Sequence, residues 1–422
     1  MPPASASLWA DDLPYPNAKV SRAQAWQRSV PHQYEDVADL ACAPAQSSSL
    51  PAKGSWMLTP PGHLRDLALK IERFHSVTLK QVLGEIEYLR DADDTAIAGG
   101  SLAYGLGNGL SDLDIVISGP NTVGSSWVPL EHFIGSLRVD VWKIGQESIE
   151  DSFGRAEKAL ASEGELLGDF GDIDHEDEFK LLHRIAFGVV VDGCGLELEE
   201  QGRDCREVAS KLVMREYAER MRASVLGAQL ALRASRPIAA VVNARLAVES
   251  ALNAALAQRG FPFSGDKWLG ERLDAEVPEL ASVYEPFRQL PADLARDGAG
   301  FVKAALHVCA EMWNLDLEFE ALAAVVRWQS TEDLRLAKIG ADQLLLAPRS
   351  GAIWELDEGE ADVWRRLTAA AGGEQDESWG LADCDPEDVT LCVRLHEHGL
   401  LSLRWIEGVP IGAFDVKRKV GV

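Results

Sequence analysis

The sequence has little that would suit a membrane helix, a zinc site or a nucleic-acid surface. Its 422 residues contain no apolar run approaching the roughly 18 residues that a membrane-spanning helix needs. The six cysteines are scattered, without a Cys-x-x-Cys pair or a Cys/His zinc spacing. Basic residues are outnumbered by acidic ones, 41 to 67, which gives a formal net charge of −26. Because nucleic-acid binding relies on Lys and Arg surfaces, we do not expect nucleic acid as a partner. Because the sequence has no long apolar run, we do not expect a membrane as a partner either.

The beginning of the chain is poor in periodic patterns and in targeting signals. Residues 1–60 are rich in Pro, Ser and Ala, and we expect them to form an irregular N-terminal extension. The first residues lack the basic-then-apolar order of a secretory signal. Together with the scattered cysteines, this predicts a cytoplasmic protein with reduced thiols.

The most informative stretch is AIAGGSLAYGLGNGLSDLDIVIS, residues 96–118, which follows a helical pattern over residues 61–91. Asp112 and Asp114 stand two residues apart in a strand-like alternation, so both carboxylates are expected on one face of the strand. Adjacent carboxylates repel each other unless a divalent cation lies between them. Hard oxygen ligands of this kind suit Mg²⁺ or Mn²⁺.

A third carboxylate and a glycine turn complete the pattern. Asp140 stands in a second strand-like segment, residues 137–144. Three carboxylates on adjacent strands can hold two metal ions about 4 Å apart, the arrangement used for in-line nucleotidyl transfer. The backbone amides around Gly99, Gly100 and Ser101 can approach phosphate oxygens closely because glycine has no Cβ, and the Ser101 hydroxyl adds a donor.

The order of these residues resembles the motif of the nucleotidyltransferase superfamily related to DNA polymerase β, which reads Gly-Ser, about ten residues, Asp-x-Asp and a later Asp. The matching residues are Gly100, Ser101, Asp112, Asp114 and Asp140. The resemblance implies that Asp112 and Asp114 bind both metal ions. It also implies that Asp140 binds the catalytic metal and helps to activate the attacking hydroxyl. The alternative is a hairpin in which Asp112 and Asp114 only cap turns.

The middle of the chain has helical periodicity. Segments 204–233, 236–259 and 300–326 are rich in Ala, Leu, Arg and Glu, and we expect an antiparallel helical bundle. The sequence Lys-Trp-Leu at 267–269 resembles the helical substrate domain of antibiotic-modifying nucleotidyltransferases. The resemblance implies that Lys267 neutralises triphosphate charge. The alternative is a surface lysine beside a buried tryptophan.

The C-terminal part has a different sequence pattern, in which strand-like segments precede helices. Three short strand-like segments between residues 334 and 356 precede two amphipathic helices, 358–367 and 386–398. This outline resembles the small winged-helix domain that recognises leader peptides, as in the chaperone of pyrroloquinoline quinone assembly. The resemblance implies that a peptide adds as an extra strand beside the sheet. A DNA-binding winged helix has the same outline, but the acidic residues around the first helix disfavour DNA. A purely structural module is the other alternative.

Together these patterns predict an α+β protein with a polymerase β-like mixed sheet, a helical bundle and a small winged-helix domain. The expected boundaries are residues 61–170 for the catalytic domain, 171–330 for the bundle and 331–410 for the winged-helix domain. The predicted catalytic and metal-binding residues are Asp112, Asp114 and Asp140, and the predicted nucleotide-binding residues are Gly99, Gly100, Ser101 and Lys267.

The predicted activity moves a nucleoside monophosphate from a nucleoside triphosphate, with ATP as the expected donor, to an acceptor hydroxyl. The expected acceptor is a small molecule or a peptide, and Mg²⁺ or Mn²⁺ is the expected cofactor. Two alternatives stay open: a non-catalytic nucleotide-binding regulator, and a nucleotidyltransferase that modifies a protein.

Overall fold

The computed structural model describes most of the chain from residue 61 to residue 405. The residues outside this description are 1–60, 123–127, 162–174, 194–204, 264–266, 325, 331–333, 340–341, 348–350, 371–377, 399 and 406–422. The predicted N-terminal extension therefore lies outside the described residues. Within them, the α+β class is confirmed, because a mixed sheet is combined with many helices.

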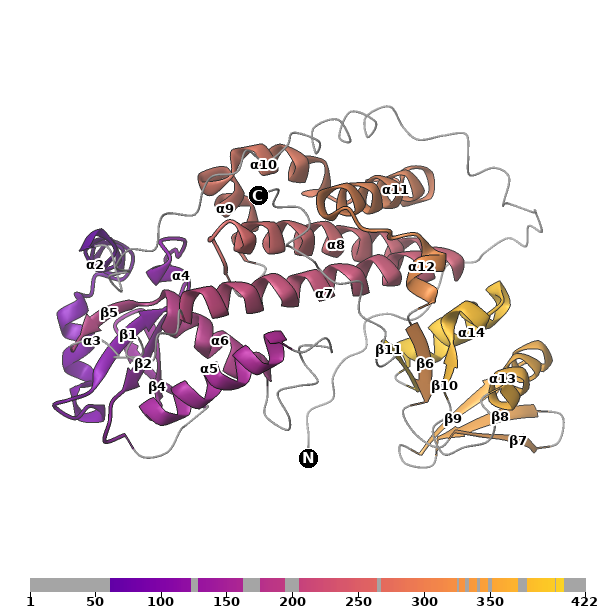
Figure 1. Ribbon diagram of the computed structural model, residues 1–422, viewed down its shortest axis with the longest axis horizontal. Helices are drawn as coiled ribbons and strands as arrows, with labels where there is room; N and C mark the ends of the chain where they lie inside the picture. The colour runs from indigo at the N-terminus through magenta and orange to yellow at the C-terminus, as the bar shows by residue number, and fades with distance from the viewer. Residues whose placement is uncertain are drawn as a thin grey trace.

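The first unit is built on a five-stranded mixed sheet with the strand order β3-β4-β2-β1-β5 (Figure 1). Strands β2 and β4 run parallel, and the other neighbours run antiparallel. The strands are β1 (Thr95–Gly99), β2 (Leu113–Ser118), β3 (Leu130–Ile134), β4 (Leu137–Lys143) and β5 (Val189–Asp192).

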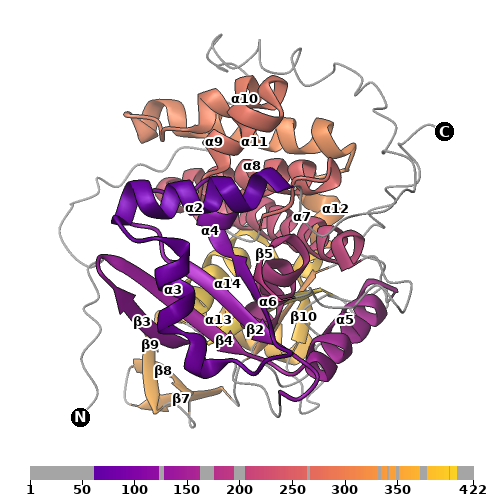
Figure 2. The ribbon, with the colours of Figure 1, turned by 90° about the vertical axis from the view of Figure 1, so that its left-hand side faces the viewer.

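Helices cover both faces of this sheet (Figure 2). They are α2 (Pro61–His75), α3 (Leu79–Glu85), the short α4 (Gly100–Ala103), α5 (Gln146–Ala161) and α6 (His175–Phe187), with a 3₁₀ turn at Glu87–Leu89. The alternation of side chains along β2 separates the two faces. Ile115 and Ile117 pack in the core with α2 and α3, whereas Val116 packs in the core with α5 and α6.

Two features of this unit differ from the sequence-based prediction. The helical pattern of residues 61–91 is divided, because Ser76 adopts a φ of 56° after α2 and Thr78 caps α3 in a capping box with Gln81. Strand β5 pairs with β1 although it lies beyond the predicted boundary at residue 170. The sheet is therefore completed by residues that the sequence assigned to the bundle.

The second unit is the helical bundle, dominated by three long helices. Its helices are α7 (Cys205–Arg233), α8 (Pro237–Gln258), α9 (Leu269–Glu276), α10 (Pro278–Tyr284), α11 (Leu294–Trp313) and α12 (Phe319–Ala323), with a 3₁₀ turn at Glu285–Phe287. The segment expected as one helix at 300–326 ends earlier, because Asn314 takes a left-handed conformation after α11. In the described part of the chain, no helix combines the length and the apolar character needed to cross a membrane.

The C-terminal unit contains two small antiparallel sheets and two helices. Its elements are β6 (Val326–Ser330), β7 (Arg335–Ile339), β8 (Asp342–Ala347), β9 (Ala352–Leu356), α13 (Glu358–Ala370), β10 (Ser378–Gly380), a 3₁₀ turn at Leu381–Asp383, α14 (Pro386–Glu397) and β11 (Leu401–Trp405). One sheet has the order β10-β6-β11 and the other β7-β8-β9. The predicted boundary after residue 330 thus separates β6 from the strands that pair with it.

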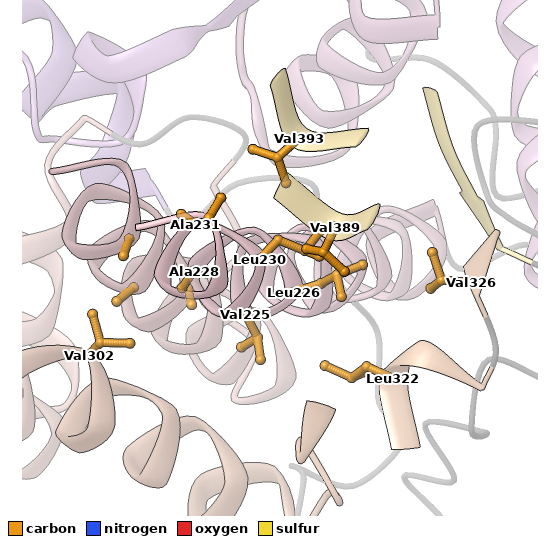
Figure 3. Packing of buried hydrophobic residues seen from close by; sticks show 14 of the residues in the cluster. Val225, Leu226, Ala228, Leu230, Ala231, Val302, Leu322, Val326, Val389 and Val393 are labelled. Atoms are coloured by element: carbon orange, nitrogen blue, oxygen red, sulfur yellow. The ribbon is translucent and has the colours of Figure 1, made fainter. Parts of the chain in front are cut away.

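Helix α7 connects the hydrophobic cores of the three units. Near its N-terminal end, Leu212 and Tyr217 belong to the core formed with α5 and α6. Further along, Leu226 belongs to the core shared with α8, α11 and the C-terminal unit, and Figure 3 shows it facing Val389 of α14. The C-terminal unit is therefore packed against the bundle through buried apolar side chains.

The packing of α7 against α14 predicts a stability difference between two leucines. Leu226 is 3% exposed and Leu246 on α8 is 41% exposed. Replacing Leu226 by Ala should lower the free energy of unfolding by about 2–5 kcal/mol, because it leaves a cavity in the shared core. The control Leu246→Ala should change it by less than about 1 kcal/mol. Urea unfolding followed by circular dichroism measures both, and equal effects of the two substitutions would contradict this packing.

Candidate active site

Four residues stand opposite one another in neighbouring strands at one end of the five-stranded sheet. The register pairs Gly99 of β1 with Asp114 of β2, and Asp114 with Asp140 of β4. Asp140 in turn pairs with Glu131 of the edge strand β3. Since paired residues in a sheet point to the same face, and adjacent strands lie about 4.8 Å apart, these carboxylates form a row on one surface. This surface is the one covered further along by α5 and α6.

The carboxylates differ in their exposure to water. Asp114 is 6% exposed and Asp140 is 5% exposed, whereas Asp112 stands just before β2 and is half-buried. Burial raises the pKa of the Asp114 carboxyl above its usual value. The negative charges of Asp112 and Asp140 raise the pKa of Asp114 further, although the nearby Arg184 guanidinium opposes the shift. The three predicted aspartates are therefore electrostatically coupled.

Arg184 of α6 compensates the charge of Asp114. Its Nη2 atom lies 3.3 Å from the Oδ1 atom of Asp114. The guanidinium also lies over the ring of Trp142 on β4, with its Cζ atom 4.4 Å from the ring centroid. This stacking fixes the arginine between the helix and the sheet, so α6 contributes directly to the site.

Arg138 compensates the charge of Asp140 from within the same strand. Its Nε atom donates a hydrogen bond of 2.9 Å to Oδ1 of Asp140, and its Nη2 atom donates one of 2.8 Å to Oδ2. The same Nη2 atom donates a hydrogen bond of 2.9 Å to Oε1 of Glu131. The two residues Arg138 and Asp140 stand on the same face because they are two positions apart in β4. Such a forked contact is the strong geometry for an arginine–carboxylate pair.

The predicted glycine turn lies directly against the carboxylates. Gly99 ends β1, and Gly100 begins α4 with a φ of 73°, in the left-handed region that favours glycine. A Cβ atom at Gly100 would overlap Oδ2 of Asp114. A Cβ atom at Gly99 would lie 2.8 Å from Cβ of Arg184. Both glycines are thus required by the close approach of α6 and of Asp114, a reason that the sequence did not reveal.

An aromatic cluster connects this turn to the helical bundle. The hydroxyl of Tyr104, directly after α4, lies 2.8 Å from Nε2 of His183, and the two rings stack with centroids 5.2 Å apart. Burial lowers the pKa of His183 to about 3, so the ring is neutral. Tyr104 also meets Phe263 edge-on at 5.1 Å. The connection that follows α8 is therefore held against α4.

Lys267 lies on this same connection, at the turn before α9, and it is exposed. Among the described residues, no hydrogen bond or ion pair joins Lys267 to the aspartates or to Gly99, Gly100 and Ser101. The structure thus brings the three aspartates and the turn together, whereas the role predicted for Lys267 stays a prediction.

The donor atoms of this site fit Mg²⁺ or Mn²⁺ by type, since buried carboxylate oxygens are the ligands that these ions prefer. As the side chains stand, however, no three His, Cys, Asp or Glu residues in the described ranges are grouped to hold a metal ion. Arg184 and Arg138 engage Asp114 and Asp140 instead. A cation at these carboxylates would therefore replace contacts that the two guanidinium groups now make.

Two residues of the site were not found by sequence reasoning. Glu131 and Arg184 belong to no motif, and each reaches the site through pairing or packing with a distant segment. For Glu131 the only local signal is its place in a short alternating segment before a Gly-Ser turn. For Arg184 the sequence around it gives only a helical pattern.

No family model matches the chain, and neither does any curated protein sequence. Among solved structures, the chain is similar to the nucleotidyltransferase-like protein from Exiguobacterium sibiricum 255-15, with a TM-score of 0.32 and 9% sequence identity. The alignment covers 63% of this chain and 98% of that one. At this level of similarity the comparison carries no argument about chemistry, which depends on the geometry of the site.

Proposed function

We propose that the protein is a metal-dependent nucleotidyltransferase. It would move a nucleoside monophosphate from a nucleoside triphosphate, with ATP as the expected donor, to an acceptor hydroxyl and release pyrophosphate. The observation that carries this proposal is the row formed by Gly99, Asp114 and Asp140, in which a glycine turn lies beside two buried carboxylates on adjacent strands. This row supports a triphosphate site and a reaction centre at one end of the central strands of the sheet.

The chain's own residues would divide the work between binding and charge compensation. Gly100 and Ser101 would present backbone amides and a hydroxyl to the phosphate oxygens. Arg184, once released from Asp114, would be a planar cation suited to phosphate. Mg²⁺ held by Asp112, Asp114 and Asp140 would neutralise charge at the α-phosphoryl group and lower the pKa of the acceptor hydroxyl. Lys267 would add a positive charge near the triphosphate. Among the described residues it forms no hydrogen bond or ion pair with the aspartates or with Gly100 and Ser101.

The C-terminal unit supports a peptide as the acceptor. The sheet β7-β8-β9 leaves the outer edges of β7 and β9 without a partner strand among the described residues. These strands also expose Ile339 at 60% and Ile353 at 64%. An exposed sheet edge with apolar side chains can accept an extended peptide as an additional strand. The net charge of −26 disfavours a nucleic-acid acceptor.

One observation favours a second function, a nucleotide-binding regulator without catalytic activity. Asp114 and Asp140 are each paired with an arginine, so the site is charge-compensated without a metal ion. In such a protein the glycine turn would bind a nucleotide, and the arginines would stay on the carboxylates. Nucleotide binding without pyrophosphate release would distinguish this function from the first.

The proposed activity predicts that Asp114 and Asp140 are both essential. In the double variant Asp114→Asn/Asp140→Asn, pyrophosphate release should fall by at least about a thousandfold, because the carboxylate charges that the reaction needs are removed while the side-chain shapes are kept. The assay follows release from each ribonucleoside triphosphate with Mg²⁺, with pooled small molecules or peptides as acceptors. Asp274→Asn, at an exposed position on α9, is the matched control and should keep full activity.

If the double variant does not fold, Asp112→Asn at the half-buried position carries the same test. Tight binding of a triphosphate without release, equal in the wild type and the variants, would reject the enzyme and favour the regulator.

The glycine turn makes a second prediction. Gly100→Ala should reduce activity by at least about a hundredfold, because a Cβ atom there would overlap Asp114 and the positive φ strains any other residue. Gly84→Ala is the control, since a Cβ atom at Gly84 in α3 would have no neighbour within 4 Å. This control should keep both activity and stability. An active, stable Gly100→Ala variant would show that the turn does not depend on glycine.

A further inference from the structure

The edge strand β3 contributes a charged residue to the face that carries the aspartates. Glu131 pairs with Asp140, and Phe133 pairs with Arg138, so both β3 residues point to this face. Figure 2 shows β3 at the border of the sheet. Glu131 is therefore the third carboxylate in the row, one strand beyond Asp140, and neither the sequence motif nor the proposed reaction uses it.

Arg138 lies between these two carboxylates. Its Nη2 atom is 2.8 Å from Asp140 and 2.9 Å from Glu131, so one nitrogen contacts both acceptors at once. The side chain of Asp140 is 7% exposed and that of Glu131 is 53% exposed. An arginine guanidinium stays protonated in proteins, so Arg138 is cationic beside either partner. Arg138 therefore has a buried partner and an exposed partner within the same reach.

We propose that Glu131 is a positioning residue: it takes Arg138 from Asp140 when a divalent cation binds at the aspartates. This inference rests on the proposed function and identifies how the charge-compensated site would open. The guanidinium would turn toward Glu131 while the backbone of β4 keeps its place, because Nη2 already contacts both carboxylates. Asp140 would then offer its oxygens to the cation.

The physical reason is the conflict between two positive charges. A guanidinium that holds both oxygens of Asp140 and a divalent cation at the same carboxylate repel each other, most strongly in a buried site. Arg138 must leave Asp140, and it would lose its ion pair if no second acceptor were near. Glu131 supplies that acceptor, so moving the arginine exchanges one ion pair for another.

A merely structural role for Glu131 has different consequences. An exposed ion pair across two strands contributes little to stability and has no effect on cation binding. The negative charge of Glu131 could also attract a cation through space, independently of Arg138. Measuring cation affinity in the presence and absence of Arg138 separates these three cases.

The experiment is a titration of Mn²⁺ into the full-length protein without nucleotide, following free Mn²⁺ by electron paramagnetic resonance. Glu131→Gln should weaken Mn²⁺ binding by about two- to fivefold, because Arg138 then stays on Asp140; this range corresponds to the loss of one exposed ion pair. Arg138→Ala should strengthen binding. In the Arg138→Ala background, Glu131→Gln should have no further effect.

A matched control is Glu285→Gln, which removes the ion pair of 2.8 Å with Arg288 at a position 71% exposed. It should leave Mn²⁺ affinity unchanged. The inference is overturned if Glu131→Gln leaves Mn²⁺ binding unchanged, if it weakens binding equally without Arg138, or if neither the wild type nor Arg138→Ala binds Mn²⁺.

Pyrophosphate release, measured in parallel, tests the proposed function separately. The expected Mn²⁺ pattern without any release would keep the role of Glu131 and reject nucleotidyl transfer. Pyrophosphate release in the wild type, with no effect of Glu131→Gln on Mn²⁺ binding, would keep nucleotidyl transfer and reject the role of Glu131.

Discussion

The parallel pairing of β2 with β4 is the constraint on which the site depends. Register and alternation together place Asp114 beside Asp140, while Ile115 and Val141, one residue further along each strand, fill the opposite core. A shift of one residue would bring Asp140 into that apolar core and Val139 or Val141 to the site. The hydrophobic residues next to Asp114 and Asp140 in each strand therefore fix the register, and with it the position of the two carboxylates. Both buried faces of the sheet contribute, so stability and site geometry have the same origin.

Two buried carboxylates side by side require positive charge, and the fold supplies it from two directions. Arg138 comes from the same strand as Asp140, whereas Arg184 comes from α6 and stacks on Trp142. Leaving either carboxylate buried and unpaired would cost several kcal/mol, on the order of 3–5. The close approach of α6 that brings Arg184 to Asp114 is possible only because Gly99 has no side chain. The carboxylates and their arginine partner thus require the glycine turn, independently of the proposed phosphate binding.

The periodicity of side chains within a segment predicted the strands and helices whose formation depends on that segment alone. The alternation around Asp112 and Asp114, the strand of Asp140 and the long helices were all readable, because side-chain period is set within a segment. The break at Ser76 depends on a single left-handed residue, which periodicity does not report. Strand β5, Glu131 and Arg184 reach the site through partners that are distant in the sequence. Their roles depend on strand register and on packing between distant segments, and neither can be predicted from the residue pattern of a single sequence.

The arrangement of the units along α7 restricts the kind of acceptor that the C-terminal unit could hold. Helix α7 has 29 residues and shares buried cores with the first unit near one end and with α14 further along. At about 1.5 Å per residue, Leu212 in the first core and Leu226 in the second lie about 20 Å apart along the helix. Figure 1 shows the five-stranded sheet and the sheet β7-β8-β9 on opposite sides of the molecule. A small acceptor bound at β7 or β9 would be too far from Asp140 to react. An extended peptide can be held at one end and still reach the carboxylates, so a binding role for this unit requires a long acceptor.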